Sequence, residues 1–525
     1  MKSRPDWRRF GSRHLLSGGS PTPGPDQTDS AKSGVEQEAS STGTRDLGSL
    51  IAIVVGFVAS RVLYRLAGIR FDTTPVERFW QIVDPVLLQD RLVESLLHLH
   101  SQPPLFNLGL GLSLKLFGDH ASAALAVVYV GLGLVLTLAL HALLRSLGVG
   151  RVLSVILTLA FVASPPTVLY ENWLFYTYPV ATLLCAAAVM LRRFLRAGTL
   201  ASALGFFALL ATVVLTRSLF HWMWYVGIWI VLAGLQADRR KRLVVAGAVP
   251  FLVIATWHVT NHAVLGSTAG GTWLGMSLSK TTTFLLPRAE RERSVEQGRL
   301  SPYALIPPFS DLGAYGDVRA PTPKTGVPIL DNERKASGAV NFHNVAYREI
   351  GRAYFEDAVR VLRARPGAHI GGWSLSYLIC FLPASDNYFL LRNRRQIAGF
   401  DRLYSHALCG QIRYAPESTA ESLARQAPAR RLLGVGWWLL AGYAIAVTYG
   451  AGVVRRALAA APRDAVLGLT AGFLVLNVIW IVGVGNAVEL GENNRFRFVA
   501  DPLCLALLGL FIQDRVSRWR RVGER

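Results

Sequence analysis

Residues 121–140 read ASAALAVVYVGLGLVLTLAL, twenty consecutive positions without a charged side chain. An α-helix needs about 20 apolar residues to cross the hydrocarbon core of a bilayer. Similar runs recur along the chain, in which 51% of the 525 residues are hydrophobic and only 17% are charged. The stretch therefore indicates a transmembrane helix, and its repetition indicates a multi-spanning membrane protein.

The basic residues of the chain gather in short clusters between the apolar runs. These clusters lie at 145–151, 192–196, 239–242, 455–463 and 515–521. Loops rich in Lys and Arg stay on the cytoplasmic side of a membrane. Threading the chain through them places both termini in the cytoplasm and predicts about ten spans, near 47–66, 121–140, 152–168, 173–190, 200–215, 220–235, 243–259, 432–454, 465–484 and 498–511.

The net charge of +21 does not indicate nucleic-acid binding, because the basic residues are spread over these clusters and no folded basic domain carries them. The cysteines Cys185, Cys380, Cys409 and Cys504 show no metal-ligand spacing. Cys380 and Cys409 both fall on the outward side in this topology, where a disulfide could form, but free thiols are the simpler expectation.

Four regions follow from this organisation. Residues 1–46 are rich in Ser, Gly, Thr and Pro and predict a disordered cytoplasmic tail. Residues 47–259 form an N-terminal transmembrane module with a first outward loop at 69–120, and 260–431 form an extracytoplasmic, α-rich loop region. Residues 432–525 hold the last transmembrane helices and a short cytoplasmic tail. Two further apolar stretches, 103–117 and 369–391, would break the alternation of sides and are expected to be interfacial, juxtamembrane helices.

The first outward loop concentrates acidic residues directly after a membrane helix. Asp72 lies nearest the end of the first span, where bulk water is least accessible and a carboxylate suits general-base work on a hydroxyl. The competing interpretation is a solvated helix surface, which accounts well for the other acids of this loop. No P-loop, GxSxG or HExxH pattern is present. A metal site from His98 and His100 is not expected, because residues two apart point to different faces of a helix.

Basic residues at the outer ends of the predicted helices are unexpected under the positive-inside rule and fit a lipid-linked phosphate, which lies at that depth. Snorkelling of the side chains to the headgroups is the alternative. Arg217 and His221 share a helix face if their turn is helical, and the segment GENNRFRFVADP adds a carboxylate and two cations just before the last span. The candidate substrate-binding residues are Arg61, His100, Glu171, Arg217, His221, Glu492, Arg495 and Arg497.

Three short elements resemble those of the type-C glycosyltransferases, in particular the bacterial relatives of the dolichyl-phosphate-mannose protein mannosyltransferases and the lipid A aminoarabinose transferases. They are Phe71-Asp72, His100 with Pro103-Pro104-Leu105, and Glu492 with Arg495, Arg497 and Pro502. The resemblance implies a polytopic helical body with juxtamembrane helices and an outward-facing active site. It also implies transfer of a sugar from a polyprenyl-phosphate donor to a glycan, lipid or protein acceptor.

The resemblance further implies an essential carboxylate in the first loop, matching Asp72, with Asp84 as second choice. Two departures bear on the substrate and on metal dependence. Asp72-Thr73 stands where relatives carry an Asp-Glu pair, and Ser101 and Gln102 interrupt the His-Pro-Pro element. A divalent cation is thus left open as a cofactor, and no metal ligand is assigned.

The sequence is therefore interpreted as an inverting membrane glycosyltransferase of a bacterial plasma membrane, with its active site on the extracytoplasmic face and membrane lipids around it. In this mechanism Asp72 takes the proton of the acceptor hydroxyl while the phosphate leaves from the opposite side of the anomeric carbon. The alternatives are a lipid or glycan transporter, against which no inverted repeat is evident, and a non-catalytic scaffold.

Overall fold

The computed structural model describes residues 47–266, 271–414, 422–423, 425–459 and 465–523, so the predicted tail at 1–46 lies outside the described residues. The described residues are helical, and the β contacts among them are three isolated bridges. After the helix Leu47–Leu66, the α-helices are α2 (Pro75–Arg78), α3 (Pro85–Asp90), α4 (Leu92–Leu97), α5 (Leu105–Phe117), α6 (Ala121–Ser146), α7 (Arg151–Val162), α8 (Pro165–Glu171), α9 (Thr177–Ala197), α10 (Leu200–Thr216), α11 (Trp222–Leu235), α12 (Arg240–Leu265), α13 (Leu274–Lys280), α14 (Arg288–Glu296), α15 (Pro328–Asp331), α16 (Ala346–Ala364), α17 (Pro366–Cys380), α18 (Leu391–Arg394), α19 (Ala398–Ala407), α21 (Pro428–Leu432), α22 (Trp437–Ala459), α23 (Ala465–Val488) and α24 (Asn493–Gly523).

Short 3₁₀ helices join several of these elements, namely η1 (Gly118–His120), η2 (Ala237–Arg239), η3 (Thr283–Leu285), η4 (Pro302–Leu305), η5 (Leu312–Tyr315), η6 (Tyr388–Leu390) and η7 (Arg395–Ile397). The chain divides into two units, Met1–Ile51 and Ala52–Arg525. Only the first residues of the helix Leu47–Leu66 represent the first unit among the described residues.

Six described helices are long and apolar enough to cross a membrane, and a seventh span is added if the bent pair α7 and α8 counts as one. The chain is therefore a multi-pass membrane protein by the length and composition of its helices. The prediction of ten spans is not confirmed. Helices α10 and α11, predicted as spans, have only 17 and 14 residues, and α9 ends in a run of arginines that lowers its hydropathy.

The two stretches expected to be interfacial, 103–117 and 369–391, are both largely helical. The first forms α5, which η1 joins to α6 within one apolar stretch of 42 residues. At 1.5 Å per residue such a stretch exceeds any hydrocarbon core. Gly118 breaks it, because its positive φ of 50° departs from helical geometry. The second stretch forms α17, which ends before Pro383 and continues as the short elements η6 and α18.

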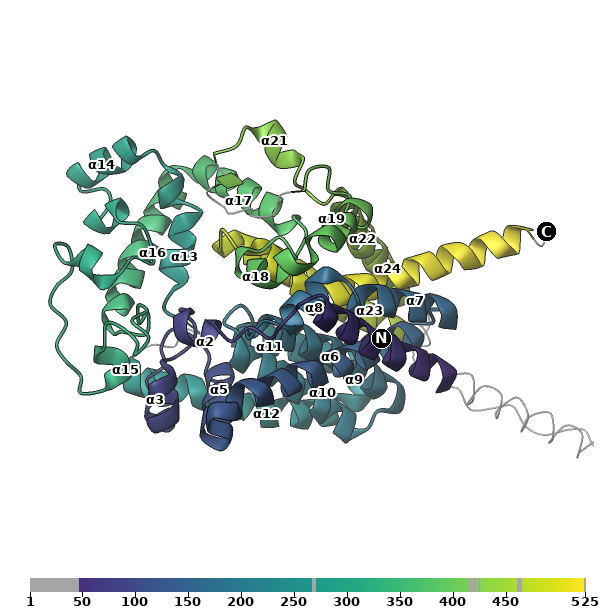
Figure 1. Ribbon diagram of the computed structural model, residues 1–525. Coiled ribbons are helices and arrows are strands. Elements are labelled where there is room, and N and C mark those ends of the chain that lie inside the picture. Colours follow the sequence, from purple (N-terminus) through teal and green to yellow (C-terminus); the bar gives the residue numbers. More distant parts are fainter. Residues whose placement is uncertain (1–46, 267–270, 415–421, 424, 460–464, 524–525) are drawn as a thin grey trace, which may run out of the picture. The chain divides into compact units, whose positions relative to one another are not determined.

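Helix α9 is the centre of the helical body. It packs against α6, α10, α23 and α24 (Figure 1), and most of its side chains are buried. Helix α24 contacts α22, α23 and α9, and its last turns extend away from the body towards the C-terminus. This arrangement sets the N-terminal turn of α24, with Arg495 and Arg497, beside the start of α9, where Arg495 donates to Thr177 Oγ1 at 3.1 Å.

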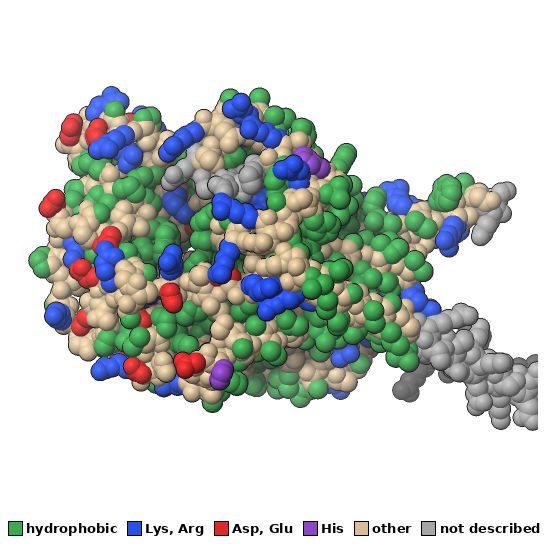
Figure 2. Space-filling view, viewed as in Figure 1, with side chains coloured by type: hydrophobic (Ala, Val, Ile, Leu, Met, Phe, Trp, Pro, Cys, Tyr) green, Lys and Arg blue, Asp and Glu red, His purple; other side chains and the backbone are tan. Residues whose placement is uncertain are grey.

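The predicted loop region after α12 is folded around its own aromatic core, with α13 packed directly on α16. A Cβ at Gly275 would lie 1.9 Å from the Gly351 carbonyl oxygen, so the two helix backbones touch and only glycine fits. On the face drawn in Figure 2, acidic side chains gather over this region, while the helical body is mostly hydrophobic. The loop region thus differs in surface chemistry from the body. The four cysteines are free, as expected.

Candidate functional site

A cavity of about 460 Å³ lies where the first loop, the predicted loop region after α12 and the ends of α10, α23 and α24 meet. We call this loop region the long loop. The cavity draws side chains from seven separate parts of the sequence, which only the tertiary fold brings together. Four of the candidate residues line it: Arg217, His221, Glu492 and Arg495. The other polar or charged residues in its wall are Gln81, Ser101, Gln102, Ser218, Ser277, Lys280 and Glu489. We call this space the central cavity.

Arg217 is the unusual charge in the central cavity. It follows the last residue of α10 and is only 3% exposed. Its side chain makes no hydrogen bond or ion pair with any residue that the structure describes, and its Nη1 is buried. The guanidinium is held instead over the Phe496 ring, 4.1 Å from the centroid. Burial lowers the pKa of Arg217 to about 10, so it stays protonated at neutral pH.

The other two cations of the central cavity are paired. Arg495 forms an ion pair with Glu492 three residues earlier, and Lys280 at the end of α13 forms one with Glu489. Arg495 still leaves its buried Nε without an acceptor among the described residues. Buried charges are stable when they are paired and hydrogen-bonded. Arg217 is therefore the cation whose charge the described protein leaves uncompensated.

Aromatic rings form the rest of the wall. Trp80 of the first loop stacks on Phe309 of the long loop, with centroids 4.7 Å apart and planes 17° apart. Tyr176, Trp273, Trp480 and Phe496 complete the aromatic lining. A cavity with flat apolar walls and a few convergent charges is the usual form of a small-molecule site.

The first loop is fastened to the long loop at several points around Trp80. Lys335 Nζ donates to the Phe79 carbonyl at 2.6 Å, and the Ala336 amide donates to Asp84 Oδ2 at 2.7 Å. Asp84 Oδ1 also accepts the Val86 amide at 3.1 Å as the N-cap of α3. Both carboxylate oxygens of Asp84 are thus used to hold the loop, and Asp84 does not line the central cavity.

His100 has a similar fastening role. Its Nε2 lies 2.8 Å from the His343 carbonyl and its Nδ1 lies 2.8 Å from Thr272 Oγ1, and the ring is buried. Burial lowers the pKa of His100 to about 4, so the ring is neutral at physiological pH. The neighbours that interrupt the expected His-Pro-Pro element, Ser101 and Gln102, are the ones that line the central cavity.

Asp72 does not line the central cavity, and its neighbour Phe71 lines a separate groove with Arg61 and Glu171. Its backbone forms a parallel bridge with Trp173, and its Oδ1 accepts the Thr74 amide at 3.0 Å. The Arg392 guanidinium is 3.9 Å from the same oxygen. Asp72 Oδ2 accepts no hydrogen bond from the residues that the structure describes. Asp72 therefore has one carboxylate oxygen that accepts a hydrogen bond and one that does not, whereas both oxygens of Asp84 accept hydrogen bonds.

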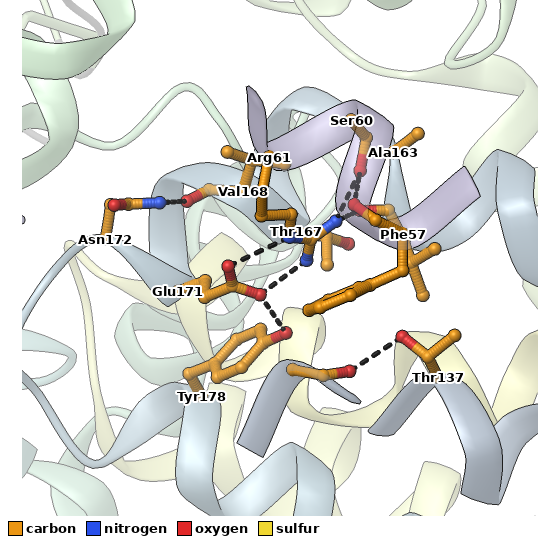
Figure 3. Close-up of polar contacts among 12 residues, drawn as sticks. Phe57, Ser60, Arg61, Thr137, Ala163, Thr167, Val168, Glu171, Asn172 and Tyr178 are labelled. Carbon is orange, nitrogen blue, oxygen red and sulfur yellow. Dashed lines mark hydrogen bonds and ion pairs between the residues drawn. The ribbon is translucent and has the colours of Figure 1, made fainter. Parts of the chain in front are cut away.

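Arg61 and Glu171 form a separate polar centre within the helical body (Figure 3). Arg61 Nε donates to Glu171 Oε1 at 2.9 Å, and Tyr178 donates to Glu171 Oε2 at 2.9 Å. Arg61 Nη1 also donates to the Val162 carbonyl at 2.7 Å. That carbonyl belongs to the break between α7 and α8, which bend by 56°. Arg61 thus satisfies an acceptor that the broken helix leaves free, as apolar surroundings require.

This pair lines a second groove of about 530 Å³ between the helix Leu47–Leu66 and α6, apart from the central cavity. The Glu171 side chain fits at this position only because residue 133 is glycine. A Cβ at Gly133 would lie 2.2 Å from Glu171 Oε2. Arg497 is also placed outside the central cavity. It donates to the Cys380 carbonyl and to Asp501 Oδ1, each at 2.7 Å, and thereby ties α24 to the end of α17.

Sequence reasoning missed the residues whose roles depend on distant neighbours. Lys280 and Glu489 form an ion pair across 209 positions, and neither belongs to a recognisable pattern. The sequence feature that could have indicated this pair is Lys280 itself, which is the one charged residue in the segment GTWLGMSLSKTTTFLL. Among the described residues, no group of three or more His, Cys, Asp or Glu side chains is arranged to hold a metal ion.

The helices and the central cavity define a multi-spanning helical membrane protein with a cationic, aromatic-lined cavity. No family model and no curated protein sequence matches the chain. In the solved structures the chain is similar to the Archaeoglobus fulgidus oligosaccharyltransferase, in its apo form and tethered by a disulfide bond to an acceptor peptide containing the NVT sequon. The identities are 13% and 11%, each with a TM-score of 0.36 and 90% of this chain covered. The chain spans about half the length of these proteins, 52% and 50%.

Proposed function

We propose that the chain is a membrane glycosyltransferase that moves a sugar from a polyprenyl-phosphate donor to a glycan, lipid or protein acceptor. The uncompensated charge of Arg217 is the observation that carries the proposal. A sugar joined to a lipid through one phosphate carries a single negative charge. The described side chains of the central cavity comprise three cations and two carboxylates, so one positive charge remains to meet it.

The chemistry of the wall supports the same ligand. Arg217 and Arg495 offer guanidinium groups, which bind phosphate oxygens in a fixed, often bidentate geometry. The Trp80 and Phe309 rings offer flat apolar surfaces for a sugar ring. Two of the three elements of the type-C resemblance border this space, since Gln102 and Glu492 line it, whereas Phe71 lines the second groove.

The proposed reaction is an inverting displacement at the anomeric carbon. The bond between that carbon and the phosphate oxygen breaks, and a bond to the acceptor oxygen forms on the opposite face. A carboxylate takes the proton of the acceptor hydroxyl, and the lipid phosphate leaves with the bonding electrons as a phosphomonoester. Arg217, Arg495 and neutral His221 stabilise the charge that grows on the leaving phosphate.

Asp72 is the proposed base. Its free Oδ2 can accept a proton without loss of a hydrogen bond, whereas both oxygens of Asp84 hold backbone amides. Glu171 and Arg61 are proposed to support the helical body beside the donor lipid.

The proposed site faces outward in a bacterial plasma membrane, because the basic clusters lie at the other ends of the helices. A single cysteine introduced at Glu296 on α14 tests this orientation. Reagents that cannot cross the membrane should label it in intact cells. Labelling only by membrane-permeant reagents would place the long loop inside and overturn the orientation.

The function itself is tested with purified protein and a polyprenyl-phosphate donor that carries a radiolabelled hexose. A glycosyltransferase binds this donor and, with an envelope extract as acceptor, releases polyprenyl phosphate. A flippase would move the donor intact across vesicles, and a scaffold would do neither. Arg217→Ala should raise the KM for the donor, whereas Arg288→Ala, which changes an exposed side chain on α14, should leave it unchanged. Intact donor after incubation with every extract would contradict the proposal.

A further inference from the structure

The charges that face the central cavity can be counted one by one. Its described lining contains the cations Arg217, Lys280 and Arg495 and the carboxylates Glu489 and Glu492. His221 is the remaining titratable imidazole, and burial together with nearby His258 lowers its pKa, so it is neutral at physiological pH. Residues 267–270, next to Gly271 of the wall, contain no ionisable side chain. The excess is one positive charge.

The two ion pairs of the central cavity leave hydrogen-bonding capacity but no further net charge. Glu489 is held by Lys280 and accepts the Leu490 amide at 3.1 Å. Glu492 is held by Arg495, and its other oxygen accepts the Tyr388 hydroxyl at 3.3 Å. Carboxylate oxygens have four lone-pair positions, so both can still accept hydroxyl groups. Such paired carboxylates suit a ligand with several hydroxyl groups.

We propose that the sugar carried by the donor is uncharged, a neutral hexose or pentose without an amino or carboxyl substituent. The inference rests on the proposed function, because the donor phosphodiester is assigned the one excess positive charge. An ammonium or carboxylate group on the sugar would then face two ion pairs whose charges already cancel, with no unpaired charge left to meet it. A buried charge without a partner is costly, and like charges side by side add to that cost.

The aromatic wall favours the same substrate. Trp80 and Phe309 are stacked across the two loops, and Trp273 lies edge-on to Phe309 with centroids 5.8 Å apart. These rings offer apolar contact to the C–H face of a sugar, and Glu489 and Glu492 of the same cavity can accept its hydroxyl groups. Neutral sugars present both surfaces at once. A charged substituent would lose hydration without gaining a compensating charge.

Three synthetic donors test the inference, each with the same polyprenyl phosphate and with a hexose, the corresponding uronate or the corresponding amino sugar. Binding to the purified protein is measured directly, so no acceptor is needed. The hexose donor should bind at least about 10-fold more tightly than either charged donor. Equal binding of all three would overturn the inference and leave the proposed function standing. Failure of all three to bind would remove the proposed function as well.

If the ion pair of Lys280 and Glu489 sets the preference for an uncharged donor sugar, two variants should change that preference. Glu489→Gln frees the Lys280 charge and should favour the uronate donor, while Lys280→Met frees Glu489 and should favour the amino-sugar donor. Each shift should be about 10-fold relative to the hexose donor. Glu292→Gln, which breaks an exposed pair with Arg288, is the matched control. Equal weakening of all three donors in both variants would mean that the pair only supports the fold, and would contradict the inference.

Discussion

Arg61 is largely buried and Arg217 is fully buried, each in the outer part of an apolar helix or just after one, yet their surroundings differ in one respect. Arg61 lies against a fully buried carboxylate, and Glu171 in turn accepts the Tyr178 hydroxyl (Figure 3). Arg217 lies against the rings of Phe496 and Tyr176, with no carboxylate partner among the described residues. The two arginines were equivalent candidates in the sequence.

The difference separates a structural charge from a ligand-binding one. A paired buried cation stabilises the fold only as long as its partner remains, because removal of either member leaves the other as an uncompensated buried charge. An unpaired buried cation costs stability, and it is retained where a ligand supplies the missing charge. We therefore expect the Arg61 pair to govern unfolding and Arg217 to govern donor binding. The following experiments test that contrast.

The largest effect on the rate of sugar transfer is expected at Asp72 and Asp84 of the first loop. These two carboxylates also differ as a ligand-facing group and a structural group. Asp72→Asn should reduce transfer by about 10²–10⁴-fold without changing the unfolding temperature, because the amide keeps the size of the side chain and cannot take a proton. Asp84→Asn should instead weaken the fastening of the loop, since Asp84 Oδ2 accepts the Ala336 amide. Initial rates and thermal unfolding of both variants provide the measurement. Normal rates for Asp72→Asn with collapse for Asp84→Asn would move the base to Asp84.

The Arg61 pair should show the next effect, in stability. Arg61→Met leaves Glu171 buried without its cation and also frees the Val162 carbonyl, so the free energy of unfolding should fall by about 3–5 kcal/mol. Thermal or denaturant unfolding in detergent measures this loss. Arg288→Met removes a partner from the exposed pair with Glu292 and should cost less than about 1 kcal/mol. A small loss for Arg61→Met would show that the contrast between the two arginines is wrong.

Arg217 should show the converse behaviour. Arg217→Met removes an uncompensated charge from an aromatic setting, so we expect an unchanged or higher unfolding temperature. Binding of polyprenyl phosphate should weaken by about 30-fold or more, because a phosphate loses its charge partner. Arg495→Ala should weaken binding as well but should also destabilise the protein, since Glu492 loses its partner. Unchanged lipid-phosphate binding in both variants would remove the phosphate role of the central cavity.

The smallest effect concerns the fastening of the loops. The pKa of His100 is lowered to about 4 in the folded protein, so the unfolded chain binds a proton first as the pH falls below about 6.5. The contribution of His100 to stability is therefore complete above pH 6.5 and is lost as the pH falls towards 4. We expect a loss of about 1–2 kcal/mol between pH 7 and pH 5. His100→Gln should flatten this dependence, whereas His120→Gln at an exposed position should not.

The sequence by itself determined the membrane character of the chain and the location of most helices. Runs such as 121–140 are long enough to satisfy the bilayer, and backbone hydrogen bonding in lipid then requires a helix. It also singled out four residues of the central cavity, because basic and acidic side chains next to outward helix ends are rare enough to be noticed. The prediction of ten spans is not confirmed, because α10 and α11, with 17 and 14 residues, are shorter than the six helices that are long enough to cross a membrane.

Only the tertiary structure decided which of the candidate charges are satisfied. Arg61 and Arg217 both read as outer-end arginines in the sequence, and pairing over 110 positions distinguishes the first from the second. The same holds for Glu489 with Lys280, and for Asp84 with the amide of Ala336, whose partners lie hundreds of positions away. A charge in low dielectric is stabilising or costly according to its nearest partner. Local sequence carries no record of a partner that the fold brings from elsewhere.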